Sequence, residues 1–450
     1  MATWARDAVV YHLFPMGLCG APPRNDFSSA PVPRLEALRP WIRHARELGA
    51  NTILLGPVLE SSAHGYDTAN FGEVDRRLGT TELVQSLVGE AHGLGMKVLY
   101  DAVFGHVGRD FWAFRDVREH GASSKWAGWF KGLRFDAKSP LGDPFGYECW
   151  KGAWELPRLE LKNPAVREHL FGNVDHWVRT FGFDGLRLDT ADWLDLDFLE
   201  ALRAHCDSLR EDLWLMGEVV HGDYRKQAHP RALHSVTNYE CSKGLWSSLN
   251  DRNYFEIAYA LNRQFGTGGL YRDLPLYAFA DNHDVDRAAT SLKRREDLPL
   301  LYALLFTMPG VPSIYYGSEF GLQGRRTATD DRVLRPRLTV EEAAAGGDAG
   351  LSRTIQRLIA LRQASPALRR GDYTQQQVAK EQLVFLRSSP EQTVLVGLNC
   401  GDQAATLDLA LRTGGSRLRD LAGEGPEIAV AGGRARITIE PHGVRLLELR

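Results

Sequence analysis

The sequence predicts an α/β protein: a (β/α)8 TIM barrel with a subdomain inserted after strand three and a C-terminal antiparallel β domain. Three observations predict this. Short apolar runs alternate with amphipathic helical stretches from residue 9 to about 371, one interval of this alternation is far too long, and the pattern changes after residue 371. Strand–helix alternation implies a parallel sheet. Eight such strands close most naturally as a barrel, although a doubly wound open sheet is the alternative.

Eight short apolar runs have the length and composition of buried parallel strands. Helix-like stretches between them repeat their apolar residues at three- and four-residue spacing, and several end in Gly, as helix C-caps do. Asn163-Pro164 reads as a helix start. The predicted strands cover residues 9–15, 51–58, 97–103, 185–191, 213–219, 232–239, 275–284 and 312–319, and helical stretches include 35–49, 81–95, 165–182 and 298–310.

The domain limits follow from the two breaks in this pattern. Between the third strand and the helix at 164 lie about sixty residues, well beyond a normal βα loop, so we assign 104–160 to an inserted subdomain. The barrel then comprises 1–103 and 161–371, and the short alternating strands of 372–450 predict a β-sandwich. The stretch EEAAAGGDAG, residues 341–350, is expected to be a flexible loop.

Composition excludes several classes of protein. A content of 44% hydrophobic and 25% charged residues is that of a folded globular chain, and a formal charge of −3 argues against a nucleic-acid partner. No run of about 18 apolar residues is present, so no membrane association is expected. The five cysteines lack ligand or disulfide spacing, and no apolar leader precedes the first strand. We therefore expect a cytoplasmic protein, and its oligomeric state is not predicted.

Polar residues that do not suit a core cluster at the carboxyl ends of predicted strands. In a parallel barrel those ends converge on one mouth, where active sites lie. A single Asp there can simply cap the next helix, and a single His can be structural, but the joint occurrence indicates a site. The residues are Asp101 and His106 after strand three, Arg187 and Asp189 at strand four, Glu218 at strand five, and Asn282, His283 and Asp284 at strand seven.

Three carboxylates without a Cys/His metal set indicate glycoside hydrolysis, which uses one carboxylate as nucleophile and another as acid/base. Arg187 beside Asp189 is expected to keep the pKa of that carboxyl low, which suits a nucleophile. Glu218 lies between apolar residues and near other carboxylates, so its pKa is expected to be raised, as an acid catalyst requires. Asp284 would bind sugar hydroxyls and help to keep Glu218 protonated.

The motifs around these residues resemble glycoside hydrolase family 13, the α-amylase family. DAVFGH (101–106), GLRLDTADW (185–193), GEV (217–219) and FADNHD (279–284) resemble its motifs at strands three, four, five and seven. LPRLELKNPAVREHL (156–170) and GVPSIYYGSE (310–319) resemble two further regions, and all six occur in the family's order.

The resemblance implies roles residue by residue. Asp189 would be the nucleophile, Glu218 the acid/base and Asp284 the third carboxylate. The implied substrate-binding residues are Arg187, His106, His283 and Tyr66 at the −1 sugar, Asp67 near its far hydroxyls, and Trp193 and His221 where the family builds its acceptor subsites.

Within the family, three stretches are most similar to the cyclomaltodextrinase, neopullulanase and maltogenic amylase group. These are HGYDTANFGEVDRRLG, GYECWKGAWELPRL and GEVVHGDY. The chain departs from that group by starting directly at the barrel, without the N-terminal β domain that contributes to dimerisation and narrows the site. Neither the exact specificity nor the oligomeric state therefore follows from the resemblance.

The resemblance implies a retaining hydrolase of α-1,4-glucosidic bonds in maltooligosaccharides, cyclodextrins or starch. A transglycosylase or an endo-acting α-amylase is the near alternative, and a non-catalytic carbohydrate-binding protein the distant one. Five Trp of the inserted subdomain either stack on sugar rings or form its core, and we expect one or two to contact substrate. They are Trp112, Trp126, Trp129, Trp150 and Trp154.

No cofactor is expected. Many α-amylases hold a calcium ion for which the Asn of the strand-three motif supplies a ligand, but position 105 is Gly here and offers no side-chain oxygen. Calcium is therefore not expected to be required.

Overall fold

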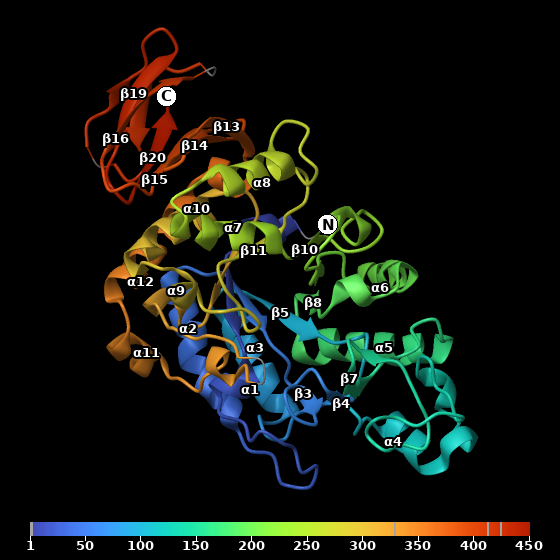
Figure 1. The fold of residues 1–450 in the computed structure, drawn as a ribbon. Helices are drawn as coiled ribbons and strands as arrows, with labels where there is room; N and C mark the ends of the chain where they lie inside the picture. The colour runs from blue at the N-terminus through green and yellow to red at the C-terminus, as the bar shows by residue number, and fades with distance from the viewer. Residues whose placement is uncertain (1–2, 328–329, 412–413, 424) are drawn as a thin grey trace.

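A closed barrel of parallel strands forms the centre of the molecule (Figure 1). The computed structural model describes residues 3–327, 330–411, 414–423 and 425–450. The eight strands pair in the order β10-β9-β8-β5-β2-β1-β12-β11, and a parallel bridge between Thr237 and Tyr277 closes the ring. This confirms the predicted fold class, and each predicted run overlaps one strand. The strands are β1 (Val10–Leu13), β2 (Thr52–Leu55), β5 (Lys97–Ala102), β8 (Gly185–Leu188), β9 (Trp214–Gly217), β10 (Ser235–Val236), β11 (Tyr277–Phe279) and β12 (Val311–Tyr315).

Helices connect the strands and surround the barrel (Figure 1). No helix in the described ranges is both long and apolar enough to cross a bilayer. The helices are α1 (Pro15–Leu18), α2 (Leu38–Leu48), α3 (Thr81–Gly93), α4 (Trp112–His120), α5 (Pro164–His176), α6 (Leu196–Leu209), α7 (Tyr239–Asn250), α8 (Phe255–Phe265), α9 (Ala288–Ser291), α10 (Leu298–Thr307), α11 (Val340–Gly346), α12 (Ala349–Ala364) and α13 (Pro366–Arg370).

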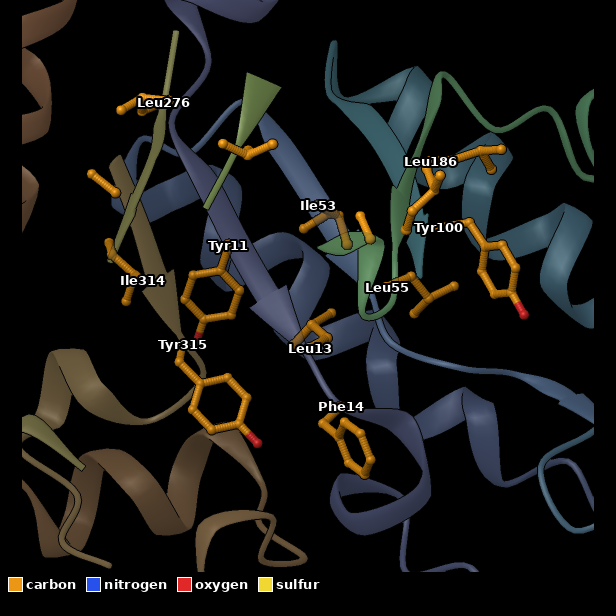
Figure 2. Packing of buried hydrophobic residues seen from close by; sticks show 14 of the residues in the cluster. Tyr11, Leu13, Phe14, Ile53, Leu55, Tyr100, Leu186, Leu276, Ile314 and Tyr315 are labelled. Atoms are coloured by element: carbon orange, nitrogen blue, oxygen red, sulfur yellow. The ribbon is translucent and has the colours of Figure 1, made fainter. Parts of the chain in front are cut away.

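Successive residues of each strand point alternately into the barrel and toward the helices, so the strands contribute to two cores. One cluster of buried side chains consists of residues such as Val10, Leu54, Leu99, Trp214 and Phe279. The other cluster lies between strands and helices, and Figure 2 shows part of it. It includes Tyr11, Leu13, Ile53, Leu55, Tyr100 and Leu186. Burial on both faces explains why the strands read as continuous apolar runs.

Two insertions extend from the carboxyl ends of the strands. A hairpin of β3 (Leu59–Ser61) and β4 (Thr68–Val74), which the sequence analysis did not predict, follows β2. The segment 104–160 follows β5 and carries α4 and the hairpin of β6 (Cys149–Trp150) and β7 (Ala153–Pro157). Three of its five Trp pack edge-on against one another, with ring centroids 4.7–5.4 Å apart: Trp112, Trp126 and Trp129.

The C-terminal segment is antiparallel, as predicted, and contains three strands that were not predicted: β13, β17 and β18. A six-stranded sheet in the order β13-β14-β15-β20-β17-β18 and a two-stranded sheet of β16 and β19 enclose one apolar core. The strands are β13 (Asp372–Val378), β14 (Gln382–Ser388), β15 (Thr393–Asn399), β16 (Ala405–Ala410), β17 (Arg417–Asp420), β18 (Ile428–Ala429), β19 (Arg434–Ile439) and β20 (Gly443–Leu449).

The expectation of a flexible loop at 341–350 is wrong. The segment forms most of α11 and the start of α12. The side chain of Thr339 accepts the N–H of Glu342, whose own side chain accepts the N–H of Thr339, and such a capping box stabilises a helix start. Alanine has the highest helix propensity of all residues, and the alanines after Glu342 outweigh the low propensity of the glycines that follow them.

Candidate active site

Arg187, at the end of β8, is surrounded by three carboxylates on three successive barrel strands. Its Nη1 lies 2.7 Å from Asp101 Oδ1 and 3.0 Å from Asp189 Oδ1. Its Nη2 lies 2.9 Å from Glu218 Oε2. The parallel register of β5, β8 and β9 places Asp101 level with Arg187, and Asp189 and Glu218 directly follow the paired residues Leu188 and Gly217. The barrel thereby joins residues that are far apart in the sequence.

Buried charge in this cluster is not balanced, because one guanidinium serves three carboxylates. Burial raises the pKa of Asp189 well above its usual range; Arg187 opposes this, and the charges of Glu218 and Asp101 add to it. Burial likewise raises the pKa of Asp101 against the effect of Arg187. The expectation that Arg187 keeps the pKa of Asp189 low is therefore wrong, because it considered the pair and not the shared cation.

Glu218 is held on both oxygens. Its Oε2 accepts the backbone N–H of Thr190 at 3.0 Å, and its Oε1 accepts the hydroxyl of Tyr239 at 3.1 Å. Thr190 has a left-handed backbone with φ of 45°, an uncommon conformation for a β-branched residue, and this turn directs its N–H toward Glu218. Asn282 in turn donates to the Tyr239 oxygen at 3.2 Å. The carboxyl of Glu218 therefore has a single well-defined orientation.

Asp284 has a different environment, between an imidazole and a guanidinium. Its carboxylate lies 3.0 Å from His283 Nε2 and 2.9 Å from Arg335 Nη2. Burial by itself would raise the pKa of Asp284, but His283 and Arg335 hold it below its usual range. Tyr66 completes this side: its hydroxyl lies 2.6 Å from His283 Nε2 and donates to Asp101 at 3.0 Å.

A cavity of about 530 Å³ opens above these side chains. Burial lowers the pKa of His106 to about 3, so this ring is neutral and can donate and accept hydrogen bonds. The residues that line the cavity include Tyr66, His106, Asp189, Glu218 and Asp284, together with Trp150, Lys151, Asp192, Val220, Tyr239, Arg326, Asp331 and Arg335. This volume suits a ligand of two or three sugar rings.

The inserted subdomain contributes one wall of this cavity through the β6–β7 hairpin. Lys151 and Gly152 both have positive φ, as a two-residue hairpin turn of type I′ requires. The turn presents Trp150 and Lys151 to the cavity, with the Lys151 ammonium 5.0 Å from the Trp150 ring centroid and 5.5 Å from that of Trp193. Of the five Trp in the segment, Trp150 is the one that lines the cavity.

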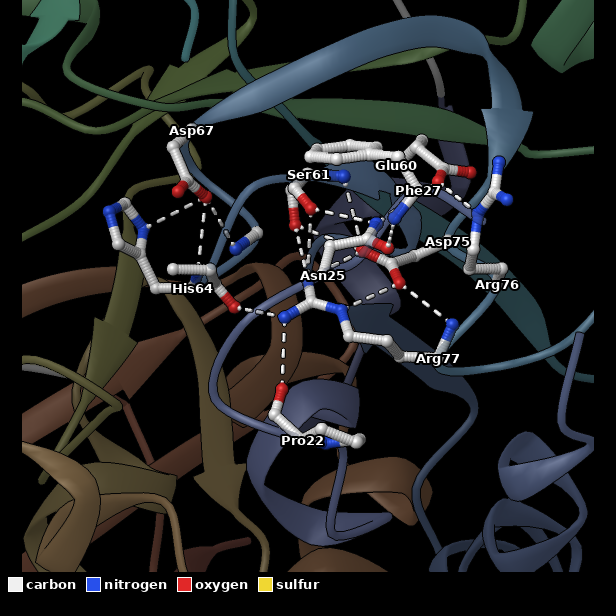
Figure 3. A network of polar contacts seen from close by, with 12 residues as sticks. Pro22, Asn25, Phe27, Glu60, Ser61, His64, Asp67, Asp75, Arg76 and Arg77 are labelled. Carbon is white, nitrogen blue, oxygen red and sulfur yellow. Dashed lines mark hydrogen bonds and ion pairs between the residues drawn. The ribbon is translucent and has the colours of Figure 1, made fainter. Parts of the chain in front are cut away.

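Five of the seven predicted binding residues do not line the cavity. The carboxylate of Asp67 accepts the backbone N–H of His64 at 3.0 Å and so orders its own loop, next to the network around Arg77 (Figure 3). Trp193 is 39% exposed beside the cavity, against Lys151. His221 is exposed. Arg187 and His283 lie beneath the cavity and position the residues that line it.

Several lining residues were not predicted. Tyr239 follows β10, where the other barrel strands carry the candidate site residues. A search for polar residues at the carboxyl ends of predicted strands could therefore have found it. Arg326, Asp331 and Arg335 lie in the connection after β12, Lys151 lies in the subdomain, and its neighbour Trp150 was one candidate among the five Trp named from the sequence. No strand end marks these five, and only the folded chain brings them to the mouth.

The barrel, its mouth of clustered carboxylates and the aromatic wall together define a carbohydrate-active enzyme of the α/β barrel class. The chain belongs to the α-amylase family: residues 42–356 match the family model of the alpha-amylase catalytic domain. Residues 375–446 match the C-terminal domain of maltogenic amylase. The protein is therefore a glycoside hydrolase.

Comparison with individual proteins agrees with this assignment. A cyclomaltodextrinase of Bacillus sp is 30% identical over 433 residues, which cover 90% of this chain and 74% of that protein. Neopullulanase 2 of Thermoactinomyces vulgaris is 30% identical over 98% of this chain and 77% of its own length. The structure of cyclic α-maltosyl-(1→6)-maltose hydrolase from Arthrobacter globiformis superposes with a TM-score of 0.82 at 25% identity, over 99% of this chain and 100% of that one.

Proposed function

We propose that the protein is a retaining α-glucan hydrolase that cleaves α-1,4-glucosidic bonds in maltooligosaccharides or cyclodextrins. The proposal rests on one observation above all: Asp189 and Glu218 contact the same guanidinium, at 3.0 and 2.9 Å. Two carboxyl groups held in this way lie close together, as the two-step mechanism needs, with a typical separation of about 5–5.5 Å.

In the first step, Asp189 in its ionised form attacks the anomeric carbon and forms a glycosyl ester, while Glu218 gives its proton to the departing glycosidic oxygen. Glu218 then takes a proton from water, which attacks the ester and releases Asp189. The ordered contacts of Glu218 with Thr190 and Tyr239 support its role as the group that moves the proton. Asp284, kept ionised by His283 and Arg335, would stabilise the positive charge that develops on the sugar.

The test is a product time course with maltotriose, cyclodextrin, pullulan and soluble starch, followed by proton NMR in the first minutes. Retention predicts products that first appear as α-anomers. Initial β-anomers would exclude the mechanism. Random internal cleavage of starch with little action on short chains would instead indicate an endo-acting α-amylase, and long products from maltotriose a transglycosylase.

A second candidate activity is hydrolysis of α-1,6 bonds in short or cyclic oligosaccharides. It is favoured by the end-to-end match to the cyclic α-maltosyl-(1→6)-maltose hydrolase. Panose and maltotriose distinguish the two activities, because they differ in one linkage only. A kcat/KM for panose cleavage at its α-1,6 bond that exceeds the value for maltotriose would favour this candidate.

We also propose that the enzyme acts in the cytoplasm without calcium. All five cysteines are free, which suits a reducing compartment. Within the described ranges, no group of three or more His, Cys, Asp or Glu is arranged to hold a metal ion. An ion pair joins two parts of the subdomain, since both terminal guanidinium nitrogens of Arg109 donate to Asp143, at 2.6 and 2.7 Å. Cell fractionation, and activity with and without a chelator, test these two points.

A further inference from the structure

A second polar cavity lies at the opposite end of the barrel, where the amino ends of β11 and β12 meet the C-terminal domain. Residues of the 3-10 helix η1 (Thr3–Asp7), of α8, of α13 and of the first two C-terminal strands line it. It holds about 40 Å³, room for about three water-sized groups, and opens to solvent. Five arginines line it, Arg6, Arg272, Arg369, Arg370 and Arg387, and one carboxylate, Asp372.

Arg387 forms the floor of this arginine pocket and has no carboxylate partner among the described residues. Its side chain is buried, and it donates to backbone carbonyls only, to Thr307 at 2.6 Å and to Gly371 at 2.9 Å. Arg362 lies close by and is also buried, and it donates to the carbonyls of Phe306 and Met308 at 2.9 and 3.4 Å. Two buried guanidinium groups are thus placed near each other, and neither forms an ion pair with a carboxylate of the described residues.

The nearby carboxylates are already used by other arginines. Asp372 pairs with Arg272, and Asp7 pairs with Arg370 and lies 3.6 Å from Arg369. Carbonyl oxygens satisfy the donors of a buried guanidinium but do not neutralise its charge, and buried charges are ordinarily paired. Burial lowers the pKa of Arg362 to about 10, and burial with the charge of Arg362 lowers that of Arg387 well below its usual range.

We propose that the arginine pocket binds a tetrahedral oxyanion of the phosphate class and so joins the barrel to the C-terminal domain. Planar guanidinium groups donate pairs of parallel hydrogen bonds to phosphate oxygens, and several of them around a small cavity make a site for a dianion. The anion would neutralise charge that the chain itself leaves unpaired. Free inorganic phosphate and the phosphate group of a sugar phosphate offer the same chemistry. This site is separate from the carboxylate mouth and does not depend on the proposed reaction.

The test is titration of the full chain with inorganic phosphate, glucose 1-phosphate and, at matched ionic strength, chloride. Calorimetry gives the affinity, and a thermal melt gives the stabilisation that binding to the folded state must produce. We expect saturable binding of one phosphate per chain and a rise in Tm that chloride does not produce. Tighter binding of inorganic phosphate identifies the free ion as the ligand, and tighter binding of glucose 1-phosphate identifies a sugar phosphate. Equal, unsaturable effects of all three salts would overturn the proposal.

Variants connect the binding to the pocket. Arg387 is buried, so its replacement could prevent folding; Arg272 is 41% exposed and is the better choice. Arg272→Gln should weaken phosphate binding about tenfold, the loss expected for one charge-assisted hydrogen bond. Arg434→Gln is the control, because Arg434 is likewise exposed and paired, with Asp408, but does not line the pocket. Arg6→Gln offers an independent second variant. An unchanged affinity in both pocket variants would refute the site.

Discussion

The two ends of the barrel carry opposite surpluses of buried charge. At the carboxyl end, one arginine contacts three carboxylates, and at the amino end, two buried arginines donate to carbonyl oxygens and, within the described part of the chain, to no carboxylate. Each arrangement costs free energy of folding, because charge taken out of water is not fully compensated. Two large apolar cores support both ends. A buried imbalance of charge therefore indicates a binding partner of the opposite sign.

At the mouth, the proposed partner is the positive charge that develops on a sugar during cleavage, which preorganised carboxylates would stabilise without rearrangement. At the arginine pocket, the proposed partner is a stable anion, which the pocket would bind without any reaction. We therefore expect substitutions at the mouth to lower activity and substitutions in the arginine pocket to change stability alone. Five measurements test the part that the mouth and the adjoining subdomain play in this comparison, beginning with the largest effect.

Asp189→Asn should abolish turnover, since it removes the nucleophile and keeps the volume of the side chain. We expect a loss of at least about 10⁴-fold in kcat on maltotriose. Circular dichroism should show an unchanged fold. More than about a tenth of wild-type activity would contradict the assignment.

Glu218→Gln should lose about 10³-fold on unactivated glucans, a loss within the range of general acid catalysis. It should lose much less on a glycosyl fluoride, whose leaving group needs no protonation. The ratio of kcat/KM on the two substrates measures this. Equal losses on both would show that Glu218 is not the acid.

Trp150→Ala should lower kcat/KM on maltooligosaccharides about tenfold, because it removes one apolar stacking surface from the cavity wall. Phe135→Ala provides a matched control: this aromatic residue lies in the same subdomain, is 41% exposed and does not line the cavity. Equal losses in the two variants would indicate a general effect on the subdomain.

Replacing the two carboxylates that flank β8, Asp189 and Asp184, should change the stability of the fold in opposite directions. The pKa of Asp189 is raised by burial, so its contribution to stability is full below the unfolded pKa and is lost as pH rises through the folded pKa. Asp189→Asn should therefore increase Tm at pH 7 by a few degrees and by less at pH 4. Thermal melts at both pH values measure the difference.

Asp184, just before the same strand, is the internal control. Burial would raise its pKa, but Lys97, the N–H of Val98 and His92 lower it, so its stabilisation is present above the unfolded pKa and lost as pH falls. Asp184→Asn should lower Tm at pH 7. A decrease in both variants would show that the mouth carboxylates are not in surplus.

Calcium removal should give the smallest effect. The ion pair of Arg109 and Asp143 joins two parts of the subdomain without a metal, and a chelator should change neither activity nor Tm. A chelator-induced decrease in Tm of more than about 5 °C, roughly 3–5 kcal/mol for a chain of this size, reversed by added calcium, would contradict the proposal. Arg109→Ala should lower Tm where the chelator does not.

The barrel could be predicted because its signals are local. Eight apolar runs of the right length, separated by helices with Gly at their ends, specify the strand number and direction. Polar residues at strand ends specified most of the mouth as well. The elements that were not predicted also have local causes. Strand β13 has the polar sequence DYTQQQV, which lacks the apolar alternation of a strand. The helix at Val340–Gly346 begins with a capping box, but the glycines after it suggested a loop.

Other features depend on distances between segments that no pattern encodes. The identity of Asp189 as a carboxylate at a strand end can be read from the chain, but its raised pKa follows from how many groups share Arg187 in the folded barrel. Trp150 likewise reaches the cavity only because the subdomain folds beside it. Arg362 and Arg387 have no distinguishing sequence pattern, and only packing buries them close together. Residue type and periodicity act over a few residues, whereas Coulomb energy and desolvation depend on every neighbour in space.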